Sequence, residues 1–249
     1  MGYIVFKKEN VATVVRQMSY SADILRDIEF GSIHGKSRDY TMVNKERSFG
    51  LYEAVEYISR NNIEGDIVEC GVWKGGQTMI MAHTLLQEND TNRKIWLYDT
   101  YTGMSEPTND DIKISTHEKA KTLLSQKDKS TERDNIWCYA PVEEVKRNVM
   151  STGYNPNNFV FVKGKVEDTI PDQMPSKIAL LRLDTDWYES THHELVHLFP
   201  RLVKGGVLVI DDYGTWEGQK KAVDQYIKEN NIKILLTRVT DGCIGVRVE

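Results

Sequence analysis

The chain has few cysteines and no long apolar run. Its three cysteines, Cys70, Cys138 and Cys243, are odd in number and far apart, which argues against a disulfide framework or a zinc site and favours a reducing, cytoplasmic location. No apolar run approaches the roughly 18 residues that a membrane-spanning helix needs, so we expect no membrane partner. The first residues are not a signal peptide, because their apolar stretch is too short and lysines follow it.

An excess of positive charge is also lacking. The 32 Lys and Arg residues face 37 Asp and Glu residues, for a net charge of −5, so the chain has no electrostatic footprint for nucleic acid. With 40% hydrophobic and 28% charged residues, its composition is that of an ordinary globular protein. We expect a single domain over residues 1–249, assembled as a homo-oligomer, a dimer or a tetramer.

Strands and helices alternate from residue 66 onward, which predicts a parallel sheet with helices on both faces. The chain should end in an antiparallel hairpin, 233–239 and 242–248, turning at Thr240-Asp241. This mostly parallel, seven-stranded, Rossmann-like α/β arrangement is typical of class I methyltransferases more than of dehydrogenases. The expected strands are 66–71, 94–99, 159–162, 178–184 and 206–211, and the expected helices are 76–87, 188–199 and 218–228.

Two regions stand apart from this alternation. Residues 1–60 predict an N-terminal helical cap, with helices at about 10–28 and 48–60. Residues 102–157 are polar and charged, with helical pieces around 117–124 and 142–150. Because a connection of this length is usually functional or disordered, we interpret it as one crossover helix plus a partly mobile lid.

A glycine-rich turn follows the first expected strand. The spacing of Gly71, Gly75 and Gly76 differs from the dinucleotide pattern, but glycines here let the backbone approach a ligand closely. Glu69 and the turn could bind the cationic amino-acid end of S-adenosylmethionine, and Lys74 could face its carboxylate. The alternative is a plain strand-to-helix turn with glycines for packing.

Asp99 ends the second expected strand, where an acidic side chain can accept hydrogen bonds from ribose hydroxyls. A turn or capping aspartate is the alternative. Together with the glycine turn, Asp99 indicates a nucleoside cofactor. The loop after the third strand, which includes Glu167, could cover the adenine.

Four carboxylates follow two further strands. Asp184 and Asp186 come after one strand, and Asp211 and Asp212 end the next, so all four should meet at the carboxyl edge of the sheet. We assign Asp184, Asp211 and Asp212 to a divalent metal, Mg²⁺, which prefers oxygen ligands. Asp186 lies further out and is assigned as the general base that deprotonates an acceptor hydroxyl. The alternative role for each aspartate is a helix cap.

Three separated strings resemble the macrocin O-methyltransferase family, whose members include macrolide-sugar and noviose O-methyltransferases. The strings are DIVECGVWKGG at 66–76, LLRLDTDWYEST at 180–191 and IDDYG at 210–214, within a resemblance that covers about residues 38–230. The resemblance implies S-adenosylmethionine as methyl donor, Mg²⁺ as metal and a sugar hydroxyl as acceptor. It also implies that Asp186, two residues after the first metal ligand, is the base.

The acceptor stays open. Family members that act on antibiotics commonly have Asp-Gly-Asp-Met-Tyr where this chain has Thr185 and Trp187, and the 102–157 insert also differs. An antibiotic-linked, a nucleotide-linked and a surface-polysaccharide sugar are therefore all considered. A catechol or phenol O-methyltransferase is a second hypothesis. A non-catalytic S-adenosylmethionine-binding protein is a third, and four acidic residues at the strand ends argue against it.

Overall fold

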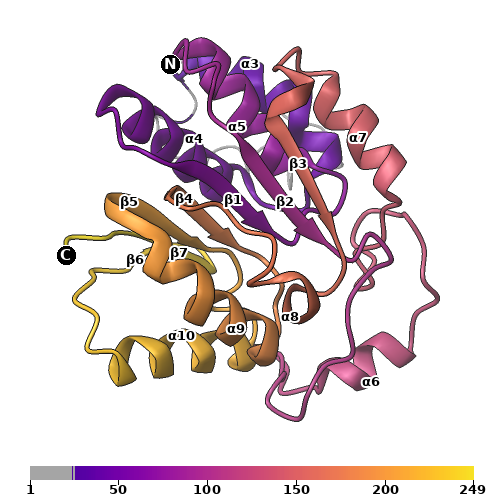
Figure 1. Ribbon diagram of the computed structural model, residues 1–249. Helices are drawn as coiled ribbons and strands as arrows, with labels where there is room; N and C mark the ends of the chain where they lie inside the picture. The colour runs from indigo at the N-terminus through magenta and orange to yellow at the C-terminus, as the bar shows by residue number, and fades with distance from the viewer. Residues whose placement is uncertain (1–23, 25) are drawn as a thin grey trace, which may run out of the picture.

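A seven-stranded sheet forms the centre of the computed structural model, which describes residue 24 and residues 26–249 (Figure 1). The strand order is β3-β2-β1-β4-β5-β7-β6. The five strands from β3 to β5 are parallel, whereas β7 runs antiparallel to both β5 and β6. This topology confirms the predicted fold class. The strands are β1 (Asp66–Cys70), β2 (Ile95–Asp99), β3 (Phe159–Lys163), β4 (Ile178–Leu183), β5 (Leu202–Ile210), β6 (Thr237–Val239) and β7 (Gly242–Val246).

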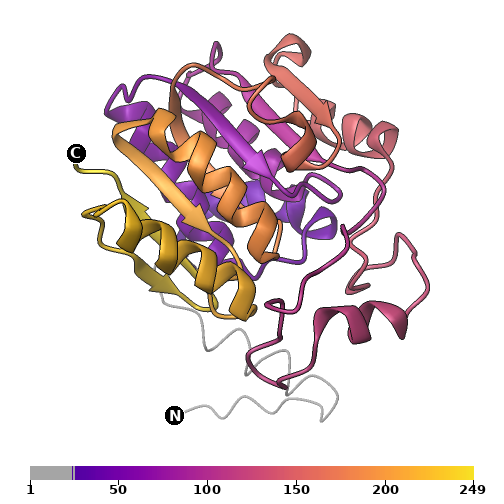
Figure 2. The same cartoon turned by 60° about the horizontal axis from the view of Figure 1, so that its bottom comes forward.

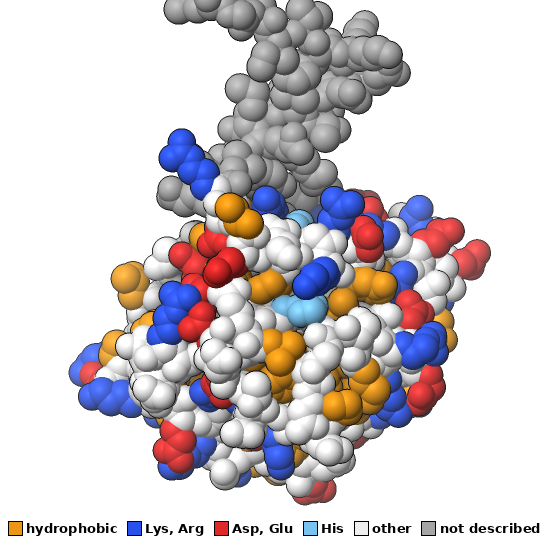
Figure 3. Space-filling model, turned by 90° about the horizontal axis from the view of Figure 1, so that it is seen from above, with side chains coloured by type: hydrophobic (Ala, Val, Ile, Leu, Met, Phe, Trp, Pro, Cys, Tyr) orange, Lys and Arg blue, Asp and Glu red, His pale blue; other side chains and the backbone are white. Residues whose placement is uncertain are grey.

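Helices cover both faces of the sheet (Figure 1). One layer consists of α4 (Lys45–Arg60), α5 (Gly76–Gln87) and α7 (Val142–Met150), with α3 (Ile28–Ser37) packed outside α4 and α5. The other layer consists of α8 (Val166–Thr169), α9 (Tyr188–Leu198) and α10 (Glu217–Glu229). Seen from the side of the first layer, charged side chains surround groups of hydrophobic ones (Figure 3).

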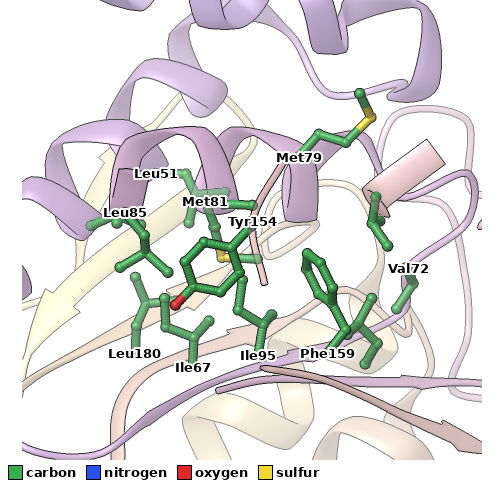
Figure 4. Close-up of a cluster of buried hydrophobic side chains, with 14 of the residues drawn as sticks. Leu51, Ile67, Val72, Met79, Met81, Leu85, Ile95, Tyr154, Phe159 and Leu180 are labelled. Atoms are coloured by element: carbon green, nitrogen blue, oxygen red, sulfur yellow. The ribbon is translucent and has the colours of Figure 1, made fainter. Parts of the chain in front are cut away.

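Two hydrophobic cores lie on the two faces of the sheet. Successive strand residues point to opposite faces, so Ile67 packs under α4 and α5 while Val68 packs under α9 and α10. Figure 4 shows the first core, where Leu51 and Leu85 from the helices meet Ile67 and Leu180 from the strands. Because β4 is buried along its whole length, its sequence is apolar without alternation, apart from Arg182.

Several boundaries differ from the predictions. The helix expected from 48 begins at Lys45, because the side chain of Asn44 caps it by accepting from the Arg47 amide at 2.9 Å. Strand β5 begins at Leu202, four residues earlier than expected, and β6 is confined to Thr237–Val239. The helix expected at about 10–28 lies almost entirely outside the described residues. Helices α3 and α8 were not predicted.

The 102–157 region divides into two parts. Its second part is α7, the crossover helix, which packs on α5. Its first part, which we call the insert (102–141), carries α6 (Ala120–Ser125) and lies at the edge where the parallel strands end (Figure 2). In the described part of the chain, no helix combines the length and the apolar character that a membrane crossing requires.

Candidate active site

A cavity of about 460 Å³ opens at the carboxyl edge of the parallel strands. The loops after all five parallel strands line it, and the insert and the segment 40–43 complete its wall. Open α/β sheets bind their ligands at this edge. From β3 across to β5, the cavity wall presents Glu167, Asp99, Gly71, Asp184 and Asp211 in the order of the strands they follow.

The glycine turn is shaped for close approach. Gly71 has φ +84°, and a Cβ there would lie 2.1 Å from the carbonyl oxygen of Asp184. A Cβ on Gly76 would lie 2.6 Å from the carbonyl oxygen of Tyr40. Gly71 and Gly76 both line the cavity, whereas Gly75 is the N-cap of α5 and does not. Glycine is therefore required at both positions because other backbone segments pack closely against them, which is the packing role considered above.

Asp99 lines the cavity and also fixes this turn. Its Oδ2 accepts hydrogen bonds from the amides of Val72 at 2.8 Å and Trp73 at 3.1 Å, and its Oδ1 accepts from Tyr101 at 2.7 Å. Burial raises the pKa of Asp99, although these three amides oppose the shift. Oδ2 uses both of its lone pairs for these amides, whereas Oδ1 accepts one hydrogen bond and keeps a further lone pair for a ribose hydroxyl.

Glu69 does not line the cavity. Its side chain is fully buried beneath it, where Oε1 lies 2.7 Å from Nη1 of Arg182 and Oε2 accepts from the hydroxyl of Thr78. Burial raises the pKa of Glu69 to about 6, although Arg182 and Thr78 oppose the shift. The predicted contact between Glu69 and the donor's amino group is not part of this arrangement.

The acidic residues after β4 and β5 meet, as the strand ends predicted. Asp184, Asp186 and Asp212 offer oxygen atoms that all lie within 4.8 Å of one another, close enough to share a metal ion. Asp211 lies beside this trio but is paired with two arginines. The structure therefore places Asp186, rather than Asp211, with Asp184 and Asp212.

Two arginines hold the cluster. Arg182 from β4 lies 2.8 Å from Asp184 and 3.2 Å from Asp211 through Nη2. Arg47 from α4 lies 3.0 Å from the Asp211 carboxylate and 2.8 Å from its carbonyl oxygen. Sequence reasoning gave neither arginine a role. The signal for Arg182 was a charged residue within a strand that is otherwise apolar.

The charges of this inner site do not balance. If all are ionised, the carboxylates of Glu69 and the four aspartates exceed the two arginines by three negative charges. Burial and Asp212 raise the pKa of Asp186 well above its usual range, and burial raises that of Asp184. Burial also opposes ionisation of Asp211, but Arg182 and Arg47 outweigh it and lower its pKa. Such an excess of carboxylate oxygens fits a hard divalent cation.

Asp186 has a backbone conformation that L-residues seldom adopt, with φ +67°. Strained residues of this kind cluster at functional sites. Its side chain lines the cavity and hydrogen-bonds to Trp216, another lining residue. Trp216 packs edge-on against Trp187, with ring centroids 5.0 Å apart. Asp186 is thus held at the wall of the cavity, next to the insert.

This fold and this cavity define a class I methyltransferase. The profile of the family described as Macrocin-O-methyltransferase (TylF) matches residues 11–247. The chain belongs to this family and is an S-adenosylmethionine-dependent O-methyltransferase, which confirms the resemblance seen in the three strings.

Characterised relatives agree with this identification. The chain is 34% identical over 191 residues to 8-demethyl-8-(2,3-dimethoxy-alpha-L-rhamnosyl)-tetracenomycin-C 4'-O-methyltransferase of Streptomyces olivaceus. It is 31% identical over 191 residues to demethyldecarbamoylnovobiocin O-methyltransferase of Streptomyces niveus. Each match spans 75% of this chain and 67% of the relative.

Solved structures share the fold. The O-methyltransferase NovP superposes with a TM-score of 0.73 at 25% identity, covering 92% of this chain and all of that one. The calicheamicin methyltransferase CalS11 superposes with a TM-score of 0.60 at 16% identity, covering 98% of this chain and 95% of its own. The second likeness concerns the fold alone.

Proposed function

We propose that this enzyme transfers the methyl group of S-adenosylmethionine to a sugar hydroxyl of a small molecule, with Mg²⁺ bound at the aspartate cluster. The observation that carries the proposal is the convergence of four aspartates at the cavity wall, beside the glycine turn. The printed name of the tetracenomycin relative, a 4'-O-methyltransferase of a rhamnosyl compound, supports a sugar as acceptor.

Asp184, Asp211 and Asp212 would hold the cation. When bound, Mg²⁺ supplies a positive charge that orients the acceptor hydroxyl and lowers its pKa. Asp211 suits this role although both of its oxygens are paired with arginines, because each carboxylate oxygen has two lone pairs. The two arginines keep Asp211 anionic and hold it in place.

Asp186 would take the proton from the acceptor hydroxyl. A base must reach its substrate, and Asp186 is partly exposed at the cavity wall, whereas Asp211 is 4% exposed and enclosed by Arg47 and Arg182. Burial and Asp212 also make the Asp186 carboxylate a stronger proton acceptor. Compared with Asp211, access therefore favours Asp186 as the base.

The donor would lie along the strand ends. Glu167 and its loop would cover the adenine, Asp99 would accept from the ribose, and the turn at Gly71 and Gly76 would face the amino-acid end. This order follows the strands β3, β2 and β1. It brings the sulfonium methyl group next to the aspartates after β4. Positioning of this kind is the main requirement, because the sulfonium already activates the methyl group.

Methyl transfer from labelled S-adenosylmethionine tests the proposal. We expect product with a panel of antibiotic-linked and nucleotide-linked deoxysugars, loss of product in EDTA and recovery with added Mg²⁺. Methylation of catechols in preference to every sugar would instead select the phenol hypothesis. Full activity in EDTA would exclude the role given to the cation. The homo-oligomer, the choice of sugar and the cytoplasmic location stay predictions.

A further inference from the structure

Gln77 has a buried side-chain oxygen without a partner. The residue lines the cavity and is 4% exposed, and its Oε1 has no hydrogen-bond partner among the described residues. A buried acceptor that stays unpaired destabilises the fold unless a ligand satisfies it. The atom therefore marks a place where a bound molecule should donate a hydrogen bond.

The amide of Gln77 is held in one orientation by its other end. Nε2 donates to Oγ1 of Thr41 at 3.0 Å and to Oγ of Ser48 at 2.9 Å. Oγ1 of Thr41 also accepts from the amide of Val43 at 3.1 Å. The hydroxyl oxygen of Thr41 thus acts as acceptor for both Val43 and Gln77. The anchors come from α4 and the segment before it, so the side chain is fixed from outside its own helix.

Gln77 lies where the donor's amino-acid end is expected. It is the second residue of α5, directly after Gly76, and α5 follows β1, which lies between β2 and β4 in the sheet. The free amides of the first turn of α5 favour a carboxylate. An acceptor oxygen beside these amides could bind an ammonium group. The amides and the oxygen together would then suit a zwitterion, which carries both a carboxylate and an ammonium.

We infer that Oε1 of Gln77 accepts a hydrogen bond from the α-ammonium group of S-adenosylmethionine. This inference rests on the donor site of the proposed function. The donor can give hydrogen bonds from three places, which are the ammonium, the adenine amino group and the ribose hydroxyls, and the ribose is assigned to Asp99. The adenine is placed two strands away, beside Glu167. Glu69, the acidic residue in this neighbourhood, is buried on Arg182 and does not line the cavity.

Calorimetry with two ligands tests the inference. S-adenosylhomocysteine carries the amino-acid end, and methylthioadenosine lacks it while keeping the nucleoside and the sulfur. Gln77→Met removes the acceptor at nearly constant length. This variant should bind S-adenosylhomocysteine about tenfold or more weakly, as expected for the loss of a hydrogen bond to a charged group. Its affinity for methylthioadenosine should change less than about threefold. Gln87→Met, on the same helix but outside the cavity lining, should leave both affinities unchanged.

Gln77→Glu distinguishes a contact with the donor's ammonium from a contact with its carboxylate. It also provides the test if Gln77→Met does not fold. A carboxylate keeps an acceptor for the ammonium, so this variant should bind S-adenosylhomocysteine within about threefold of the parent. A loss of tenfold or more would place the donor's carboxylate at residue 77 and overturn the inference. Equal weakening of both ligands in Gln77→Met, or no weakening, would also overturn it. If the parent chain binds neither ligand, the donor site itself is wrong.

Discussion

Arg182 and Glu69 form an ion pair inside the sheet, with Nη1 and Oε1 2.7 Å apart and side chains 2% and 1% exposed. The same guanidinium reaches Asp184 at 2.8 Å and Asp211 at 3.2 Å. One buried cation therefore connects strand β1 to the first residues after β4 and β5. A buried charge is tolerated only when paired and hydrogen-bonded, so the acid cluster and its arginine depend on each other.

Glu69→Gln should reduce stability without affecting the donor. The amide keeps the shape but weakens the bond to Arg182, which retains Asp184 and Asp211, so we expect a loss of about 1–3 kcal/mol in the free energy of unfolding. The affinity for S-adenosylhomocysteine should stay within about twofold. Denaturant unfolding and calorimetry measure the two effects. A tenfold loss of affinity here, with Gln77→Met neutral, would return the ammonium contact to Glu69.

Asp186→Asn and Asp211→Asn should separate the base from the metal ligand. Asp186→Asn should keep Mg²⁺ and donor binding but lose about 10²–10⁴-fold in turnover, because an amide cannot accept the hydroxyl proton. Asp211→Asn, like Asp184→Asn and Asp212→Asn, should weaken Mg²⁺ by removing an anionic oxygen. Titration of Mg²⁺ and single-turnover rates give both quantities.

Loss of Mg²⁺ binding in Asp186→Asn would also have a structural explanation. The structure groups Asp186 with Asp184 and Asp212. If Asp186→Asn loses Mg²⁺, and raised Mg²⁺ restores turnover, then Asp186 is a ligand and the base assignment is wrong. If Asp211→Asn keeps its Mg²⁺ affinity, then Asp211 is not a metal ligand. Its role would then be only to hold Arg47 and Arg182.

Asp99→Ala should weaken the binding of both S-adenosylhomocysteine and methylthioadenosine. It removes the acceptor for the ribose, worth about 1.5–3 kcal/mol for a charge-assisted contact. It also frees the amides of Val72 and Trp73 that now donate to Oδ2. Because both ligands contain the ribose, their affinities should fall in parallel, in contrast to the selective loss expected of Gln77→Met. An unchanged affinity for both would exclude the ribose assignment.

His34 should make the free energy of unfolding depend on pH. Burial, with Lys45, Arg38 and Arg133 nearby, lowers its pKa from 6.5 to about 4. Below pH 6.5 the unfolded chain binds a proton that the folded chain refuses, so stability is lost as the pH falls from 6.5 to 4. We expect a loss of about 1–3 kcal/mol for this partly exposed ring. Urea unfolding of His34→Gln should show a smaller loss, whereas His117→Gln, with an 81% exposed side chain, should match the parent.

The sheet and the cluster of aspartates were predictable because both follow from local pattern. Apolar runs mark the parallel strands, and carboxylates directly after β4 and β5 must meet at one edge. The pairing of Asp211 with Arg47 was not predictable, since the two are 164 residues apart and meet only because α4 packs beside β5. The position of Gln77 likewise depends on Thr41 and Ser48, which no local pattern connects to α5.

Glu69 is a residue that the sequence placed in the cavity and the structure does not. Its place at the end of β1 predicted a cavity residue, but successive residues of a strand point to opposite faces. Which face holds the ligand depends on how the strand twists and on which partners surround it. Arg182, directly opposite Glu69 in the register of β1 and β4, gives its carboxylate a buried partner. A sequence without its pairing register does not contain that information.

The insert should close over the site when both ligands bind, since closure excludes water from the reacting groups. One of its links to the segments after β4 and β5 is Asp111, whose carboxylate accepts from the amides of Tyr188 at 2.8 Å and Thr108 at 2.6 Å. Trypsin should cut after the exposed Lys127 or Arg133, more slowly when S-adenosylhomocysteine, Mg²⁺ and an acceptor are present. Asp111→Ala should speed this cleavage in the unliganded chain, because it releases the insert from the first turn of α9. Equal cleavage with and without ligands, in the parent chain, would show that the insert is a fixed wall rather than a lid.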